Sequence, residues 1–159
     1  MKRIIIAATA TAGLMALATP ALADTFNGTS GDDRIDGTAQ ADTIWGYTGN
    51  DRLAGLGGND EIYGGRGADE IWGGPGADWL KGELGPDTIY GRGGADTVAD
   101  GRAADVVYLG DGDDQVYTDR DGSPDRFVCG AGKDTVAYWG RPEKIDSWSG
   151  CERVINWAH

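Results

Sequence analysis

Histidine and cysteine are nearly absent from this chain of 159 residues. The one histidine is the terminal His159, and the two cysteines, Cys129 and Cys151, are too far apart for a C-x-x-C motif. A Ser-His-Asp triad or a Cys-His pair needs a histidine held inside the fold, so neither kind of nucleophilic site is indicated. Carboxylates occur throughout the sequence, and a pair of them therefore identifies no catalytic acid and base. We expect a protein that is not an enzyme.

Basic residues are also scarce. The chain has 14 Lys and Arg against 26 Asp and Glu, which gives a net charge of -12. An acidic surface of this kind argues against binding to nucleic acid or to anionic lipid.

Long apolar runs are missing except near the start of the chain. Residues 1–23 resemble a secretory signal peptide: Lys2 and Arg3 precede an apolar run, and Ala21-Leu22-Ala23 forms a cleavage site. A membrane anchor is the alternative, although the run is short for a span. Removal of the two cations would change the net charge from -12 to -14. We expect a secreted, extracellular protein with no membrane span in the mature chain.

Glycine and aspartate, by contrast, are abundant and recur every nine residues from Gly28 to Tyr117. Ten nonapeptides follow in unbroken register, beginning GTSGDDRID, GTAQADTIW and GYTGNDRLA. The first and fourth positions are mostly glycine, and the eighth is always aliphatic. The sixth position is always aspartate: Asp33, Asp42, Asp51, Asp60, Asp69, Asp78, Asp87, Asp96, Asp105 and Asp114. A short period of this kind indicates a solenoid.

The eighth position predicts a very short strand with one inward-facing side chain, and the glycine-rich residues predict the turn that follows. Two nonapeptides then complete one coil. The aspartates stack in every second repeat, about 4.8 Å apart, as two ladders of carboxylates. Such anions repel one another unless a cation lies between them. Carboxylates and turn carbonyls suit Ca²⁺, whereas Mg²⁺ retains its waters and avoids such sites.

The repeats closely resemble the RTX family, GGxGxDxUx, whose fold is a parallel β-roll with Ca²⁺ between successive turns. The resemblance implies an all-β, right-handed parallel β-roll (a β-solenoid) with two short strands per coil over residues 24–117. Besides the sixth-position aspartates, it implies calcium ligands in the glycine-rich turns, at Gly31, Gly49, Gly58, Gly67, Gly76, Gly85, Gly94 and Gly112.

The number of ions follows from the count of stacked turns. Five odd turns and five even turns each leave four gaps, which predicts about eight Ca²⁺ ions. The repeats depart from the pattern at Gln40, Asp100, Ala103 and Leu109. We therefore expect the second turn and the last two turns to be weaker sites.

Residues 118–159 are interpreted as degenerate coils that close the end of the roll. The pattern returns at Asp125 and Asp134, and Glu143 and Glu152 are expected to replace aspartate, with Ile145 and Val154 in the eighth position. Trp139, Trp148 and Trp157 suit a cap that shields the last coil, with an aromatic ligand site as the alternative. At the other end, Phe26 is in register and is expected to plug the core.

The two cysteines fit this C-terminal cap. In register, Cys129 and Cys151 are separated by about one coil, so they lie in stacked turns on the same side of the roll. In an exported protein they are expected to form a disulfide. A redox or metal-binding pair is the alternative.

Aromatic residues at the ninth position form the one surface feature beyond the motif. Trp72, Tyr90 and Tyr108 fall in consecutive coils of one sheet, and Trp45 and Tyr63 in the other. The pattern is explained by cross-strand stacking or by a stripe that binds a glycan or a protein partner. The sequence thus favours a calcium-binding structural or interaction module. An accessory or targeting module of an exported enzyme or toxin is the alternative.

Overall fold

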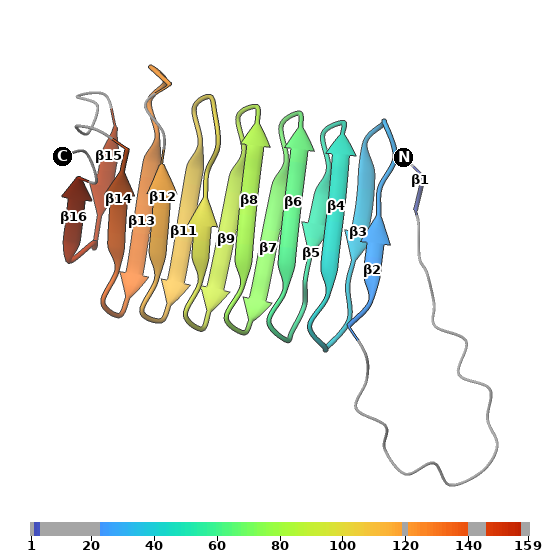
Figure 1. Ribbon diagram of the computed structural model, residues 1–159, viewed down its shortest axis with the longest axis horizontal. Helices are drawn as coiled ribbons and strands as arrows, with labels where there is room; N and C mark the ends of the chain where they lie inside the picture. Colours follow the sequence, from blue (N-terminus) through green and yellow to red (C-terminus); the bar gives the residue numbers. More distant parts are fainter. Residues whose placement is uncertain (1, 4–22, 119–120, 140–145, 157–159) are drawn as a thin grey trace, which may run out of the picture.

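The chain winds into a parallel β-solenoid, and this confirms the predicted all-β roll (Figure 1). The computed structural model describes residues 2–3, 23–118, 121–139 and 146–156. Each coil contributes one strand to each of two sheets, and both sheets contain eight parallel strands. Successive coils stack in sequence order along the long axis of the molecule (Figure 1). No helix of the described residues is long and apolar enough to cross a membrane.

The odd-numbered strands form one sheet and the even-numbered strands form the other. The first sheet contains β1 (Lys2–Arg3), β3 (Asp33–Asp36), β5 (Arg52–Ala54), β7 (Glu70–Pro75), β9 (Thr88–Gly93), β11 (Val106–Asp111), β13 (Arg126–Ala131) and β15 (Ser147–Ser149). The second contains β2 (Thr25–Asn27), β4 (Thr43–Thr48), β6 (Glu61–Arg66), β8 (Trp79–Leu84), β10 (Thr97–Ala99), β12 (Gln115–Thr118), β14 (Thr135–Tyr138) and β16 (Arg153–Asn156).

The eighth-position side chains form the core between the two sheets. The register places each of them beside its equivalent one coil away, as Ile44 beside Ile62 and Ile62 beside Leu80. From Ile44 to Val116 these side chains are completely buried. Phe26, the first member of the column, is 7 % exposed and pairs with Ile44, as expected of a plug at this end. The core is one apolar side chain wide in each strand, which is narrow for a chain of this length.

The fourth-position glycines are required because the turns stack tightly. At Gly94, φ is +120°, and a Cβ would collide with the backbone carbonyl of Gly76 in the previous coil. The neighbouring Gly93 has no such constraint, since its nearest atom to an added Cβ is the Asp111 carbonyl oxygen, 4.0 Å away. Glycine therefore serves at the fourth position both for left-handed backbone and for contact between coils.

The C-terminal coils continue the two sheets, but one part of the predicted register is wrong. Glu143 and Ile145 lie outside the described residues, and the positions expected for them are taken by Asp146 and Trp148. Trp148 pairs with Phe127, and Asp146 accepts the hydrogen bond of the Asp125 N–H. The connection before β15 is therefore longer than the repeat predicts. For the next coil the prediction is confirmed, because Val154 pairs with Val136.

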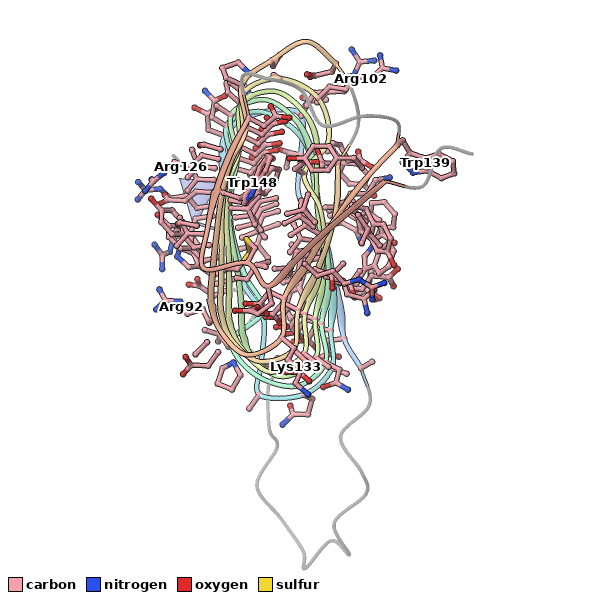
Figure 2. All side chains as sticks on the ribbon, turned by 90° about the vertical axis from the view of Figure 1, so that its left-hand side faces the viewer. Arg92, Arg102, Arg126, Lys133, Trp139 and Trp148 are labelled. Carbon is pink, nitrogen blue, oxygen red and sulfur yellow. A yellow bond between two sulfur atoms is a disulfide. The ribbon has the colours of Figure 1, made fainter. Side chains whose placement is uncertain are left out.

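The disulfide between Cys129 and Cys151 is confirmed, with a Cα–Cα distance of 5.1 Å. Tyr138 is completely buried beside it and contacts Trp148 edge-to-face at 6.1 Å. Trp139 is 66 % exposed and does not shield the core, contrary to the expectation for the cap (Figure 2). Trp157 lies outside the described residues. The closure of this end therefore depends on Tyr138 and the disulfide.

At the N-terminal end, Lys2 and Arg3 form β1, which pairs with β3 through Lys2–Asp33 and Arg3–Arg34. The rest of the predicted signal peptide, except Ala23, lies outside the described residues. Cleavage after Ala23 would leave β3 as the edge strand of its sheet.

Substitution of the two adjacent glycines tests the stacking of the turns. We expect Gly94→Ala to destabilise the fold by about 2 kcal/mol or more, because a Cβ there meets backbone in a left-handed residue. Gly93→Ala is the matched control and should have little effect. Urea unfolding of both variants at millimolar calcium measures the difference, and equal stabilities would contradict this account of the turn.

Candidate metal-binding turns

The sixth-position aspartates form two ladders that tie each coil to the next. The N–H of Asp51 donates to Oδ1 of Asp69 at 2.8 Å, and the N–H of Asp69 donates to Oδ1 of Asp87 at 2.8 Å. The same bond repeats along both sides of the roll. The ladders are longer than the ten regular repeats: the bonds begin at Asp24 on one side and reach Asp146 and Glu152.

The second oxygen of these carboxylates is buried and, in most turns, has no hydrogen-bond partner. The ladder aspartates with such an Oδ2 atom are Asp51, Asp60, Asp69, Asp78, Asp87, Asp96, Asp105, Asp114 and Asp134. An unpaired buried oxygen is costly, so these Oδ2 atoms are candidate ligand atoms in the turns where they occur.

First-position glycines allow these oxygens to approach the backbone closely. A Cβ added at Gly64 would lie 2.6 Å from Oδ2 of Asp69 and 2.9 Å from the Gly82 carbonyl oxygen of the next coil. A carboxylate oxygen and a carbonyl oxygen therefore face the same space. The arrangement recurs at Gly46, Gly55, Gly64, Gly73, Gly82 and Gly91. These oxygen donors fit a hard cation, and their number and charge favour Ca²⁺.

The first two turns differ from those that follow. Oδ2 of Asp33 accepts hydrogen bonds from the N–H and hydroxyl of Thr29, at 2.6 and 2.9 Å. Asp42 is bonded by Thr38 with the same geometry. In these two turns the threonine satisfies Oδ2, the oxygen that has no hydrogen-bond partner in most of the later turns. The second turn was expected to be weak because of Gln40, whereas the structure identifies Thr38 as the residue that differs.

Side chains replace glycine at the first position in the last turns. Leu109 and Cys129 are completely buried there, and their apolar side chains occupy the space that glycine leaves open elsewhere. Asp100 instead places a third kind of group, a carboxylate, in the same position and is 1 % exposed.

Burial dominates the electrostatics of the ladders. In six of the ladder aspartates desolvation raises the pKa, and neighbouring carboxylates raise it further, although the N–H bond from the adjacent coil opposes the shift. The pKa is about 6 for Asp51, Asp60 and Asp114, about 7 for Asp87 and Asp96, and about 8 for Asp105. Without a cation, ionisation of these groups therefore opposes the fold near neutral pH.

The structure brings together the predicted aspartates, but it assigns the glycines differently. The fourth-position glycines named from the sequence allow the coils to stack, as at Gly94, and their role as calcium ligands remains a prediction. The first-position glycines lie against Oδ2 and a carbonyl oxygen of the next coil, and they were not named as site residues. The signal was present in the sequence, since glycine recurs at both positions, but only the packing of the coils distinguishes their roles.

The aromatic residues lie as predicted on the outer faces of the sheets. Trp72, Tyr90 and Tyr108 stack in β7, β9 and β11, with ring centroids 5.8 and 5.1 Å apart. Trp45 and Tyr63 stack at 3.9 Å on the other sheet. Cross-strand stacking therefore accounts for much of the pattern.

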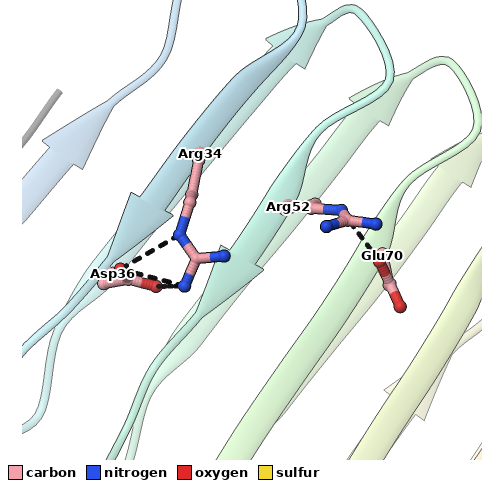
Figure 3. Close-up of polar contacts among 4 residues, drawn as sticks. All are labelled: Arg34, Asp36, Arg52 and Glu70. Atoms are coloured by element: carbon pink, nitrogen blue, oxygen red, sulfur yellow. Dashed lines mark hydrogen bonds and ion pairs between the residues drawn. The ribbon is translucent and has the colours of Figure 1, made fainter. Parts of the chain in front are cut away.

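Beside Trp72 the outer face is hollowed into a groove of about 550 Å³. Two small residues explain it, because Ala54 pairs with Trp72 across β5 and β7, and Gly74 follows in β7. Three arginines and two carboxylates rim the groove. Arg34 bonds Asp36 at 3.2 Å and Arg52 bonds Glu70 at 3.1 Å (Figure 3). The guanidinium of Arg92 lies 5.9 Å from the centre of the Tyr90 ring.

Comparison with known proteins identifies the family of the nonapeptide repeats. The family described as the RTX calcium-binding nonapeptide repeat (4 copies) matches residues 21–53, 45–80, 54–89, 72–99 and 90–122. No curated protein matches the chain. Among solved structures, the solution structure of the AlgE6R3 subunit from the Azotobacter vinelandii mannuronan C5-epimerase is 28 % identical, with a TM-score of 0.34. The match covers 62 % of this chain and 53 % of that one.

The raised pKa values predict how the metal-free protein responds to pH. A folded-state pKa above the ordinary value of 3.8 means that protonation favours the fold. This contribution is complete below about pH 4 and is lost as the pH rises through 6 to 8. In excess chelator, circular dichroism should show more β-structure at pH 5 than at pH 8. Asp105→Asn should retain more of it at pH 8, and a signal that increases with pH would contradict the prediction.

Proposed function

We propose that this chain, which belongs to the RTX calcium-binding nonapeptide-repeat family, is a secreted, non-enzymatic β-roll that folds when it binds extracellular Ca²⁺. The observation that carries the proposal is the row of buried Oδ2 atoms without partners, six of which lie beside a first-position glycine and a carbonyl oxygen of the next coil. A cation there would neutralise the carboxylate and connect it to the carbonyl oxygen of the next coil.

The same geometry supports six regular ions. Six turns combine a first-position glycine with an unpartnered Oδ2, from Gly46 and Asp51 to Gly91 and Asp96. In the two turns before them, threonine satisfies the oxygen, and after them Leu109 fills the position of the glycine. The count of about eight from the sequence therefore becomes six regular turns in this proposal.

Two features make calcium the expected folding switch. The apolar core is narrow, and the ionised carboxylates repel one another along both ladders. A ligand that binds only the folded state stabilises it by mass action, and extracellular calcium modules commonly bind with Kd of ~10⁻⁴–10⁻³ M. Below that range of free calcium, the acidic chain would remain loose.

Calcium titration with isosteric variants tests the switch. We expect the wild type to lose most of its β-structure in excess chelator and to regain it at millimolar calcium. Asp69→Asn and Asp87→Asn retain the oxygen that accepts the N–H bond but lose a ligand charge, so their calcium midpoint should rise several-fold. Metal analysis of the saturated wild type should find about six ions in regular turns.

Asp36→Asn serves as a control, because Asp36 lies on the exposed outer face and pairs with Arg34. Its calcium midpoint should match that of the wild type. The proposal is wrong if the wild type keeps the same circular dichroism spectrum and melting temperature in chelator as in calcium.

A second candidate function is supported by the groove beside Trp72. Its rim carries three arginines and two carboxylates, Asp36 and Glu70. The groove therefore has one excess positive charge, although the net charge of the chain is -12. An aromatic face beside a guanidinium suits a sugar ring that bears a carboxylate. We propose that the groove binds an acidic saccharide, with its ring on Trp72 and its carboxylate at Arg92.

Two residues of the same groove have a strained backbone. Leu56 and Arg92 have left-handed backbone, with φ of +79° and +84°. The residue at the equivalent position of the coil between them is a glycine, Gly74. A non-glycine residue in this region costs of order 1 kcal/mol or more. Burial does not offset the cost at Leu56, which is 52 % exposed. Tyr47 and Glu83 have the same conformation outside the groove, so the binding proposal rests on the lining of the groove and not on this strain.

Arg92→Gly separates binding from folding in a test of the groove. Glycine suits the left-handed backbone, so the variant should be at least as stable as the wild type while its binding weakens about tenfold or more. Trp72→Ser should weaken binding similarly, and Trp139→Ser, at an exposed site elsewhere, should not. Calorimetry at fixed millimolar calcium would compare an oligouronate trisaccharide with a neutral trisaccharide. Equal binding of the two sugars, or no effect of Arg92→Gly, would exclude this function.

A further inference from the structure

We propose that Asp100, Asp105 and Asp125 form a separate calcium site that binds more tightly than the regular turns and is filled first. This inference rests on the proposed calcium-dependent folding. It assigns a role to Asp100, a position that departs from the repeat and that was expected to weaken its turn.

The three side chains converge in the interior of one turn. One carboxylate oxygen of each lies within 4.8 Å of those of the other two. All three residues are buried, with exposures of 1 % for Asp100, 1 % for Asp105 and 5 % for Asp125. Three carboxylates packed this closely in the interior require a positive ion among them or the loss of their charge.

The surrounding hydrogen bonds hold the carboxylates in place but leave oxygens available. One oxygen of Asp100 accepts the N–H of Gly101 at 2.9 Å, and the Thr118 side chain also hydrogen-bonds to this carboxylate. Asp125 accepts the N–H of Asp105 at 3.0 Å. The Oδ2 atoms of Asp100 and Asp105 are buried and have no partner.

This turn differs from a regular turn in charge and not in architecture. At Gly82, one coil earlier, the space in front of the glycine faces Oδ2 of Asp87 and the backbone carbonyl of Asp100. One coil later the glycine is replaced by Asp100, and its carboxylate enters the equivalent space beside Asp105. Affinity for Ca²⁺ rises with the number of charged ligands and with the rigidity of the site. A site with three carboxylates is therefore expected to bind more tightly than a regular turn.

Asp100 also connects this site to its neighbour. Its carbonyl oxygen faces the cavity of Gly82 and Asp87, while its side chain belongs to the site with Asp105 and Asp125. An ion bound at the second site would fix the backbone that supplies a ligand to the first. The site lies where the regular turns meet the coils closed by the Cys129–Cys151 disulfide.

Equilibrium dialysis against calcium buffers tests the assignment. With Ca²⁺ as the probe, the full chain should bind one ion at a free calcium concentration at least about tenfold below the midpoint of the others. Asp100→Asn, which is isosteric, should lose this first class. Asp100→Gly should also lose the first class. Because this variant restores the glycine of a regular turn, its ion should bind at the higher free calcium concentration of the later class. Asp69→Asn, at a regular turn, should keep the first ion and lose a later one.

The outcomes separate this inference from the proposed function. If the wild type binds no calcium at any concentration, both fail. If it binds several ions in one class, or if Asp100→Asn and Asp100→Gly bind the first ion at the same free calcium as the wild type, only the tight site is wrong. Circular dichroism at millimolar calcium checks that each variant is folded, and the wild-type isotherm alone decides whether two classes exist.

Discussion

The structure depends on one interaction, a buried carboxylate that is satisfied through one oxygen only. From Asp42 to Asp146, Oδ1 of the ladder aspartates accepts an N–H bond from the equivalent residue one coil away, as between Asp51 and Asp69. This bond fixes the spacing of the turns and draws the carboxylate out of water. The second oxygen is thereby left inside the turn without a partner. The bond that joins the coils therefore also creates the need for a cation.

Two sets of glycines make this arrangement sterically possible, and they serve different purposes. A Cβ at the fourth position, as at Gly94, would strike the backbone of the adjacent coil. A Cβ at the first position, as at Gly64, would enter the space between the carboxylate and the next carbonyl oxygen. Close stacking of the coils and close approach of the carboxylate and carbonyl oxygens thus come from glycine at two different places in the same nonapeptide. Where the first position changes to Leu109, Cys129 or Asp100, the interior changes from a cavity to an apolar core or to a cluster of carboxylates.

The outer faces vary without disturbing this interior. Stacked aromatics, the groove beside Trp72 and the ion pairs of Figure 3 all lie on side chains that point away from the core. Because the coils repeat, a residue at an outward position meets its equivalents in the neighbouring coils. A single small residue such as Gly74 or Ala54 is then enough to form a recess. A solenoid can in this way carry a binding surface on one face while its turns carry the metal sites.

The sequence by itself determined the solenoid, the two carboxylate ladders, the buried aliphatic column and the disulfide. All of these follow from a nine-residue period, because residues at a fixed spacing must stack in register. It did not predict that Asp146 and Trp148 continue the columns, since the longer connection before β15 leaves no trace in the local pattern. Only the tertiary structure distinguished turns whose Oδ2 is satisfied by Thr29 or Thr38 from turns in which it is not. It alone placed Asp100 beside Asp105 and Asp125, because that contact depends on which side chain enters the space that glycine leaves, and the period does not specify it.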